Sequence, residues 1–96
     1  MKKHALLFTA LFSLSAITMA CDKPVAPVLP DPESAVTAQM IKAKNEMKAY
    51  IDQAEVYLKC VEADKAKYNQ MVDSMQEAAD NFNTIVRKYK DRMGAG

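Results

Sequence analysis

The sequence predicts an all-α fold: an antiparallel two-helix hairpin, similar to a coiled coil, that follows a proline-rich extended arm. Residues 33–93 contain neither Gly nor Pro, so no strong helix breaker interrupts this stretch. Apolar residues recur within it in alternating steps of four and three, the spacing of one face of a coiled-coil helix. Just before it, three prolines recur at every third position.

Residues 1–20 have the pattern of a secretory signal peptide. A short basic start, residues 1–4, precedes sixteen residues that carry no charge. This uncharged run is shorter than the roughly 20 residues of a membrane-spanning helix. We therefore expect cleavage after Ala20 and export of the remaining chain.

The exported part is expected to be small and almost neutral. Without its first twenty residues the 96-residue chain has 76 residues, with eleven Lys and Arg against twelve Asp and Glu. Segments that bind nucleic acid or a membrane surface are usually strongly basic. The charge balance therefore argues against a nucleic-acid partner, and it predicts membrane contact only if a lipid is attached.

Residues 21–33 are predicted to form the extended arm. Three prolines repeat at every third position from Pro24, so in a polyproline II helix their rings lie along one side. Asp31 followed by Pro32 is typical of a helix start, with Asp as the capping residue and Pro in the first helical position. The first helix is therefore expected over residues 34–62.

Two apolar seams indicate how the helices pair. The first seam consists of Val36, Met40, Ala43, Met47, Tyr50, Ala54, Tyr57 and Val61. The second seam consists of Tyr68, Met71, Met75, Ala78, Phe82, Ile85 and Tyr89. A turn near residues 62–65 is followed by a second helix, expected over residues 65–93. In this hairpin the small Ala43 lies opposite the large Phe82, as interdigitating packing requires. One continuous helix in an oligomeric coiled coil is the alternative, because the heptad register runs on through the middle of the chain.

The two cysteines are predicted to form a disulfide between Cys21 and Cys60. In polyproline II geometry the arm spans about 34 Å, and the first helix up to Cys60 spans about 39 Å. An arm that doubles back along this helix therefore ends close to Cys60. We expect the arm to lie on the flank of the helix that carries Ala49, Gln53 and Val56.

Lipidation of Cys21 is the alternative. Thr18-Met19-Ala20 precedes this cysteine, an order that resembles a bacterial lipobox except that Thr18 replaces the usual Leu. In this alternative Cys21 carries lipid and Cys60 is a free thiol. The protein is then a membrane-anchored lipoprotein that acts as a spacer in the cell envelope.

The sequence lacks the residue patterns of an enzyme. Its one His is His4, within the predicted signal peptide, so the exported part lacks the commonest general base and metal ligand. The chain contains no glycine-rich phosphate loop, no G-x-S-x-G elbow and no C-x-x-C pair. We expect a non-enzymatic protein without a cofactor.

Three methionines offer a further, less favoured alternative. Met71 and Met75 lie four residues apart on one helix face, and Met47 approaches them in a hairpin. Thioether sulfurs bind Cu(I), which makes a copper carrier one alternative function. All three residues occupy seam positions, where Met commonly fills space in a core. Packing is therefore the favoured interpretation, and no metal site is predicted.

An apolar stripe beside the two seams is the candidate interaction surface. This apolar flank consists of Ile51, Leu58, Val72, Ala79 and Val86. It lies on the side away from Cys60, and folding into a hairpin brings its two halves together. An arm that stays on the Cys60 side leaves the flank exposed, whereas an arm that crosses over covers it. An exposed flank predicts docking of a second copy, as a homodimer, or of another envelope protein.

Short motifs give the chain a resemblance to a group of exported proteins. They are Cys21-Asp22-Lys23-Pro24, Pro27, Pro30, Tyr57-Leu58-Lys59-Cys60, Asn81-Phe82-Asn83 and Tyr89. The combination resembles small exported helical proteins of proteobacteria that share a Cys-x-x-Pro arm, a Tyr-Leu-x-Cys end to the first helix and a Phe-Asn in the second. The resemblance implies a periplasmic location and this helical shape. We therefore expect a binding or structural module of the bacterial cell envelope.

Overall fold

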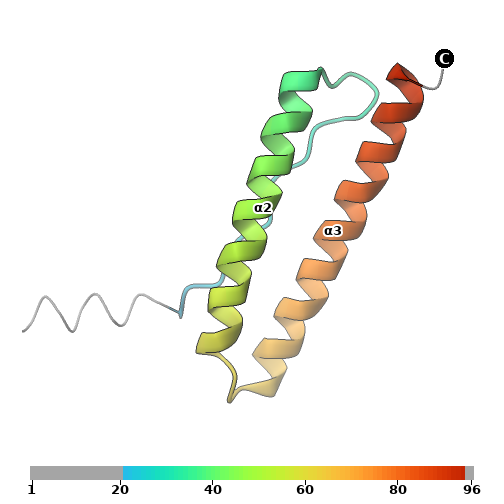
Figure 1. Cartoon of the computed structure of the whole chain (residues 1–96). Helices are drawn as coiled ribbons and strands as arrows, with labels where there is room; N and C mark the ends of the chain where they lie inside the picture. Colours follow the sequence, from blue (N-terminus) through green and yellow to red (C-terminus); the bar gives the residue numbers. More distant parts are fainter. Residues whose placement is uncertain (1–20, 95–96) are drawn as a thin grey trace, which may run out of the picture.

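The computed structural model describes residues 21–94, which form two antiparallel α-helices and an extended arm (Figure 1). Helix α2 spans Thr37–Cys60 and helix α3 spans Lys65–Met93. The chain reverses direction between them, so the predicted hairpin is confirmed and the alternative of one continuous helix is wrong. The predicted signal peptide lies outside the described residues.

The turn between the helices is short and is organised by Asp64. The N–H of Val61 donates to the carbonyl oxygen of Tyr57 at 3.0 Å, which ends α2 at Cys60, two residues before the predicted end. The Oδ1 of Asp64 accepts the N–H of Lys67 at 3.2 Å and satisfies one of the donors that are left open at the start of α3. No residue of the turn has a positive φ, so the turn does not need Gly.

Helix α2 begins at Thr37, three residues later than predicted. Asp31 starts a single turn instead of the long helix, because its carbonyl oxygen accepts the N–H of Ala35 at 2.9 Å. Val36 then has extended backbone, with φ −99° and ψ 164°, and its N–H donates to the side chain of Gln39 at 2.9 Å. This break lets the side chain of Ala35 enter the core, where it is 3% exposed. The burial of Ala35 therefore overrides the local helix-start signal.

The C-terminal end of α3 holds this break in place. The Nε of Arg92 donates to the carbonyl oxygen of Pro32 at 2.8 Å, and its Nη2 donates to the carbonyl oxygen of Ala35. The hydroxyl groups of Thr37 and Tyr89 are hydrogen-bonded close by. These contacts close the open end of the hairpin, which lies opposite the turn.

The arm runs antiparallel to α2 and passes behind it in Figure 1, from the turn end of the hairpin to the open end. Its three prolines are half-buried, as is Leu29, which packs against the core. Val25 and Val28, in contrast, are 87% and 93% exposed. The side of the arm that carries the three prolines therefore faces the helices, and Val25 and Val28 face the solvent.

The arm does not lie on the flank where we expected it. Ala49, Gln53 and Val56 are all exposed, and Val56 is 59% exposed. Arm residues instead border surface hollows together with Gln39, Ala43, Glu46 and Tyr50 of α2. In this position the arm borders residues of both helices, and apolar surface that it buries there stabilises the fold.

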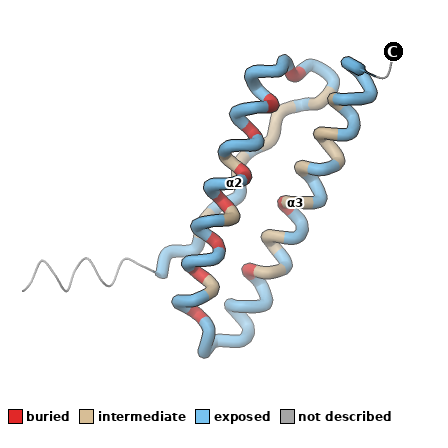
Figure 2. Tube along the Cα trace, in the orientation of Figure 1, coloured by how far each residue is buried: buried red, intermediate tan, exposed pale blue. Residues whose placement is uncertain are grey.

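The core lies where α2 meets the arm and α3. Its buried apolar residues are Ala35, Met40, Ala43, Met47, Tyr50, Ala54, Tyr57, Val61, Met71 and Ala78. Most of them belong to α2 (Figure 2), since α2 is covered by both the arm and α3. The second seam is less covered, so Met75, Phe82 and Ile85 are half-buried. Val36, the first residue of the predicted seam, is 58% exposed because it precedes α2.

Candidate functional site

A disulfide joins Cys21, at the start of the arm, to Cys60, at the end of α2. The two Cα atoms are 5.6 Å apart, which lies within the usual range for a disulfide, and the residues are 39 positions apart in the sequence. Both cysteines are exposed. The predicted pairing is therefore present, and it fastens the arm to the turn end of the hairpin. Such a bond fits an oxidising compartment.

The disulfide and the lipid alternative compete for one atom. The Sγ of Cys21 is bonded to the Sγ of Cys60, so it is not free to form the thioether of a lipidated N-terminus. In this structure Cys21 therefore has a structural role as the anchor of the arm. Neither α2 nor α3 combines the length and the apolar character that a membrane crossing needs.

The apolar flank runs along both helices. Its five residues are all half-buried: Ile51, Leu58, Val72, Ala79 and Val86. The two flank residues of α2 also pack against the core. Tyr68, which is 37% exposed, continues the flank toward the turn and borders a surface hollow of about 440 Å³ together with Leu58. Each of the five predicted residues therefore keeps contact with water.

The arm leaves this flank uncovered. Successive residues of an α-helix are about 100° apart, so Cys60, where the arm is fastened, lies almost opposite Leu58 around α2. On α3, Asn81 borders the arm and is two residues away from Ala79 of the flank. The arm and the flank therefore lie on opposite sides of the plane that contains the two helices. The alternative in which the arm crosses over and covers the flank is wrong.

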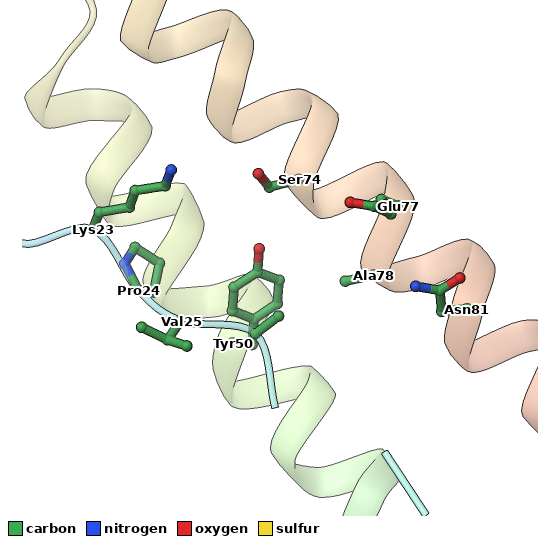
Figure 3. Close-up of a pocket in the computed structure, with 9 residues that line it drawn as sticks. Lys23, Pro24, Val25, Tyr50, Ser74, Glu77, Ala78 and Asn81 are labelled. Atoms are coloured by element: carbon green, nitrogen blue, oxygen red, sulfur yellow. The ribbon is translucent and has the colours of Figure 1, made fainter. Parts of the chain in front are cut away.

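A groove with both polar and apolar lining, the arm-side groove, lies on the arm side of the hairpin (Figure 3). It has a volume of about 410 Å³. Residues 23–26 of the arm form one wall, and Ser74, Glu77 and Asn81 of α3 lie on the other wall. The lysine of the arm and the carboxylate of α3 place opposite charges on the two walls. The groove is therefore an open depression with one charged group on each wall.

Tyr50 joins the core to this groove. The residue is 3% exposed, and its hydroxyl group points from α2 toward α3 (Figure 3). Burial raises the pKa of this phenol above its usual value of 10.0, and the negative charge of Glu77 raises it further. The phenol is therefore neutral at physiological pH, and it offers a hydrogen-bond donor and acceptor rather than a nucleophile.

The three methionines of the copper alternative lie in or beside the core. Met71 is 0% exposed and Met47 is 6% exposed, and Met75 packs half-buried against the same cluster. In these positions their side chains fill the space between the helices. In the part of the chain that the structure describes, no three His, Cys, Asp or Glu side chains gather into a group that could hold a metal ion.

Comparison of the chain with protein-family models, with curated proteins and with solved structures finds no match. The resemblance to small exported helical proteins therefore stays a prediction from the sequence motifs. Two of the motif residues have structural roles in this fold. Cys60 forms the disulfide, and Tyr57 belongs to the core with 7% of its surface exposed.

The arm-side groove is a feature that the sequence analysis missed. One signal for it was Tyr50, because a Tyr in an apolar seam needs a partner or water for its hydroxyl group. A second signal was the polar stripe of Ser74, Glu77 and Asn81 beside the second seam, at helical steps of three and four. Both signals indicate an edge of the core that contacts water. The groove itself also depends on where the arm lies.

Proposed function

We propose that the protein is a non-enzymatic, exported module of the bacterial cell envelope that binds another protein chain through the apolar flank. The observation that carries the proposal is the position of the arm. The disulfide fastens the arm to one side of the hairpin, and five aliphatic residues on the other side keep contact with water. A contiguous apolar surface of this kind is typical of a protein interaction site.

The mode of binding follows from the helical spacing of the flank. Ile51 and Leu58 are seven residues apart on α2, and Val72, Ala79 and Val86 repeat with the same spacing on α3. Such a spacing presents one straight apolar line on each helix, which suits packing against helices of a partner. The hairpin thus offers a rigid surface two helices wide.

The periplasm is the compartment that we assign to the protein. The pattern of residues 1–20 and the exposed disulfide both support this assignment, because disulfides persist where thiols are not kept reduced. Intact-mass analysis of the protein from its native envelope tests it. The expected species begins at Cys21, lacks both thiol hydrogens and carries no lipid. A diacylglyceryl group on Cys21 would instead support the lipid-anchored spacer.

Replacement of Leu58 and Val72 by Lys tests the binding surface. Both side chains are half-buried, so the helices should form, and the helical circular dichroism should be retained. Association should be lost, because an unpaired lysine is costly to bury against apolar surface. The measurements are sedimentation of the purified protein and chemical cross-linking in intact cells.

Val28→Lys is the matched control. Val28 is 93% exposed and belongs to the arm, on the side of the hairpin away from the flank, so this variant should behave like the unaltered protein. If the Leu58→Lys, Val72→Lys variant keeps every cross-linked species and the same sedimentation, the flank binds no protein and the proposal fails.

A further inference from the structure

We infer that the partner of the apolar flank is a second copy of this chain, so that two hairpins pack face to face as a four-helix bundle. This inference rests on the proposed function, because it names the partner of the same surface. Three observations support it: the level of residues along the helices, the uncharged amides that border the flank between residues 69 and 83 of α3, and the side of the hairpin on which the arm lies.

The hydrogen bond between Thr37 and Tyr89 sets the level of the two helices. Counting seven residues forward from Thr37 reaches Lys44, and counting seven residues back from Tyr89 reaches Phe82. Because the helices are antiparallel and rise equally per residue, Lys44 is level with Phe82 and with its neighbour Asn83.

Between residues 69 and 83, the α3 side of the flank is bordered by amides, and the next residue of the same seven-residue repeat is the charged Lys90. Asn69, Gln76 and Asn83 repeat every seven residues, about 60° around the helix from the flank residues. All three amides are exposed. The acidic residues of the same stretch, Asp73, Glu77 and Asp80, lie farther around α3, about 100° or more from the flank residues. Depletion of charge around an apolar surface is the compositional mark of an interface.

The α2 side of the flank decides how the two copies are related. If the two-fold axis runs parallel to the helices, α2 of one copy lies on α3 of the second copy. Lys44 then meets the uncharged Asn83 of the second copy, at the same level. If α2 lay on α2 with full overlap, Lys48 in the middle of the helix would face Lys48 of the second copy. Facing like charges oppose association, so the geometry points to the parallel axis.

The arm is compatible with this arrangement. It lies on the side of each hairpin opposite the flank, so both arms lie on the outer faces of the bundle. Every neighbouring pair of helices is antiparallel, as in up-and-down four-helix bundles. The flank moves from the edge of a two-helix core to the centre of a four-helix core, where aliphatic residues with a seven-residue spacing are fully covered.

Charge placed at Asn83 tests both the dimer and its register. Asn83→Lys sets a lysine against Lys44 of the second copy, and the two-fold symmetry creates this repulsive pair twice. In the exported, oxidised protein we expect the dimer dissociation constant to rise about tenfold at low salt, as measured by sedimentation equilibrium. Asn83→Glu creates two attractive pairs and should lower the constant about threefold. Both effects should shrink at about 1 M NaCl, where charges are screened beyond about 3 Å.

Asn81 provides the matched control. It lies two residues from Asn83 on the same helix and borders the arm-side groove, so Asn81→Lys should leave the dissociation constant unchanged. Equal effects of the two lysine substitutions would overturn the inference, as would a chain that is monomeric at about 1 mM.

Cross-linking of the Leu58→Lys, Val72→Lys variant distinguishes failure of this inference from failure of the proposed function. A monomeric protein whose cross-linked species disappear in the Leu58→Lys, Val72→Lys variant has a different partner on the same flank. That result overturns the second copy as partner and leaves the proposed function standing. A monomeric protein whose cross-linked species persist in that variant overturns both.

Discussion

The hydroxyl groups of Thr37 and Tyr89 lie 2.7 Å apart and join the first residue of α2 to the end of α3, across 52 positions of sequence. Arg92 binds the preceding loop from the same end of α3. At the other end of the hairpin, the Cys21–Cys60 disulfide and the Asp64 cap hold the turn. The hairpin is therefore fastened at both ends, which matters in a fold this small because its core buries little apolar surface.

Replacement of Arg92 by Ala should lower the free energy of unfolding by about 2 kcal/mol, because two backbone carbonyl groups lose a charged donor. Urea denaturation measures the change, and amide exchange should quicken around Ala35. Arg87→Ala is the control, since Arg87 is exposed and its removal should cost less than about 0.5 kcal/mol. Equal losses in the two variants would show that the carbonyl contacts contribute nothing.

Replacement of both Cys21 and Cys60 by Ser should lower the free energy of unfolding by about 3–4 kcal/mol. The bond closes a loop of 39 residues, and its removal returns conformational freedom to the unfolded chain. Thermal unfolding measures the effect. The unaltered protein under reducing conditions is the control and should lose the same stability. A reduced protein as stable as the oxidised one would contradict the anchoring role of the disulfide.

Met71→Ala should cost about 2–5 kcal/mol, because it opens a cavity at a side chain that is 0% exposed. Met93→Ala removes the same atoms at a position that is 55% exposed, so it should cost less than about 0.5 kcal/mol. Chemical denaturation of both variants gives the comparison. A similar small cost at both positions would mean that the two helices do not pack against each other at Met71.

Stability should fall at high pH as Tyr50 ionises. The folded state raises the pKa of this phenol above 10.0, so it holds the proton more tightly than the unfolded chain does. The resulting stabilisation is fully present below the unfolded-state pKa and is lost as the pH rises through the folded-state pKa. Denaturation at a series of pH values, compared with Tyr50→Phe, isolates this contribution. A pH dependence that is identical in the two proteins would argue against it.

Glu77→Gln separates the two causes of that shift. Burial of Tyr50 stays the same, while the nearby negative charge is removed, so the pKa should fall part of the way toward its usual value. The phenolate absorbance that is lost in Tyr50→Phe reports this titration. Glu55→Gln, on the outer side of α2, should leave the pKa unchanged.

Local spacing was enough to predict the helices, the seams and the pairing of the cysteines. Steps of four and three select one face of a helix. The extended arm is about as long as the first helix, so Cys21 could be placed near Cys60. The choice between a hairpin and a long helix needed more, because both satisfy the same periodicity. Side-chain size resolved it correctly at pairs such as Ala43 and Phe82.

The start of α2 and the path of the arm could not be obtained in this way. Asp31 and Pro32 satisfy every local rule for a helix start, yet the helix begins later because Arg92, 60 positions from Pro32, binds the loop and Ala35 is buried. The arm likewise follows the groove beside Tyr50, where it contacts both helices. The start of α2 and the path of the arm both depend on contacts between segments that are distant in the sequence. A pattern of neighbouring residues carries no information about such contacts.

The disulfide also determines which part of the chain extends under a pulling force. Tension applied between Cys21 and Gly94 passes through the sulfur bridge to Cys60 and bypasses the arm and α2. While the bond is intact, only the turn and α3 can be drawn out, which yields at most about 120 Å of extended chain. After reduction the whole stretch from Cys21 to Gly94 extends to about 250 Å. With the bond intact, the arm and α2 carry none of the tension, and reduction about doubles the distance to which the chain can be extended.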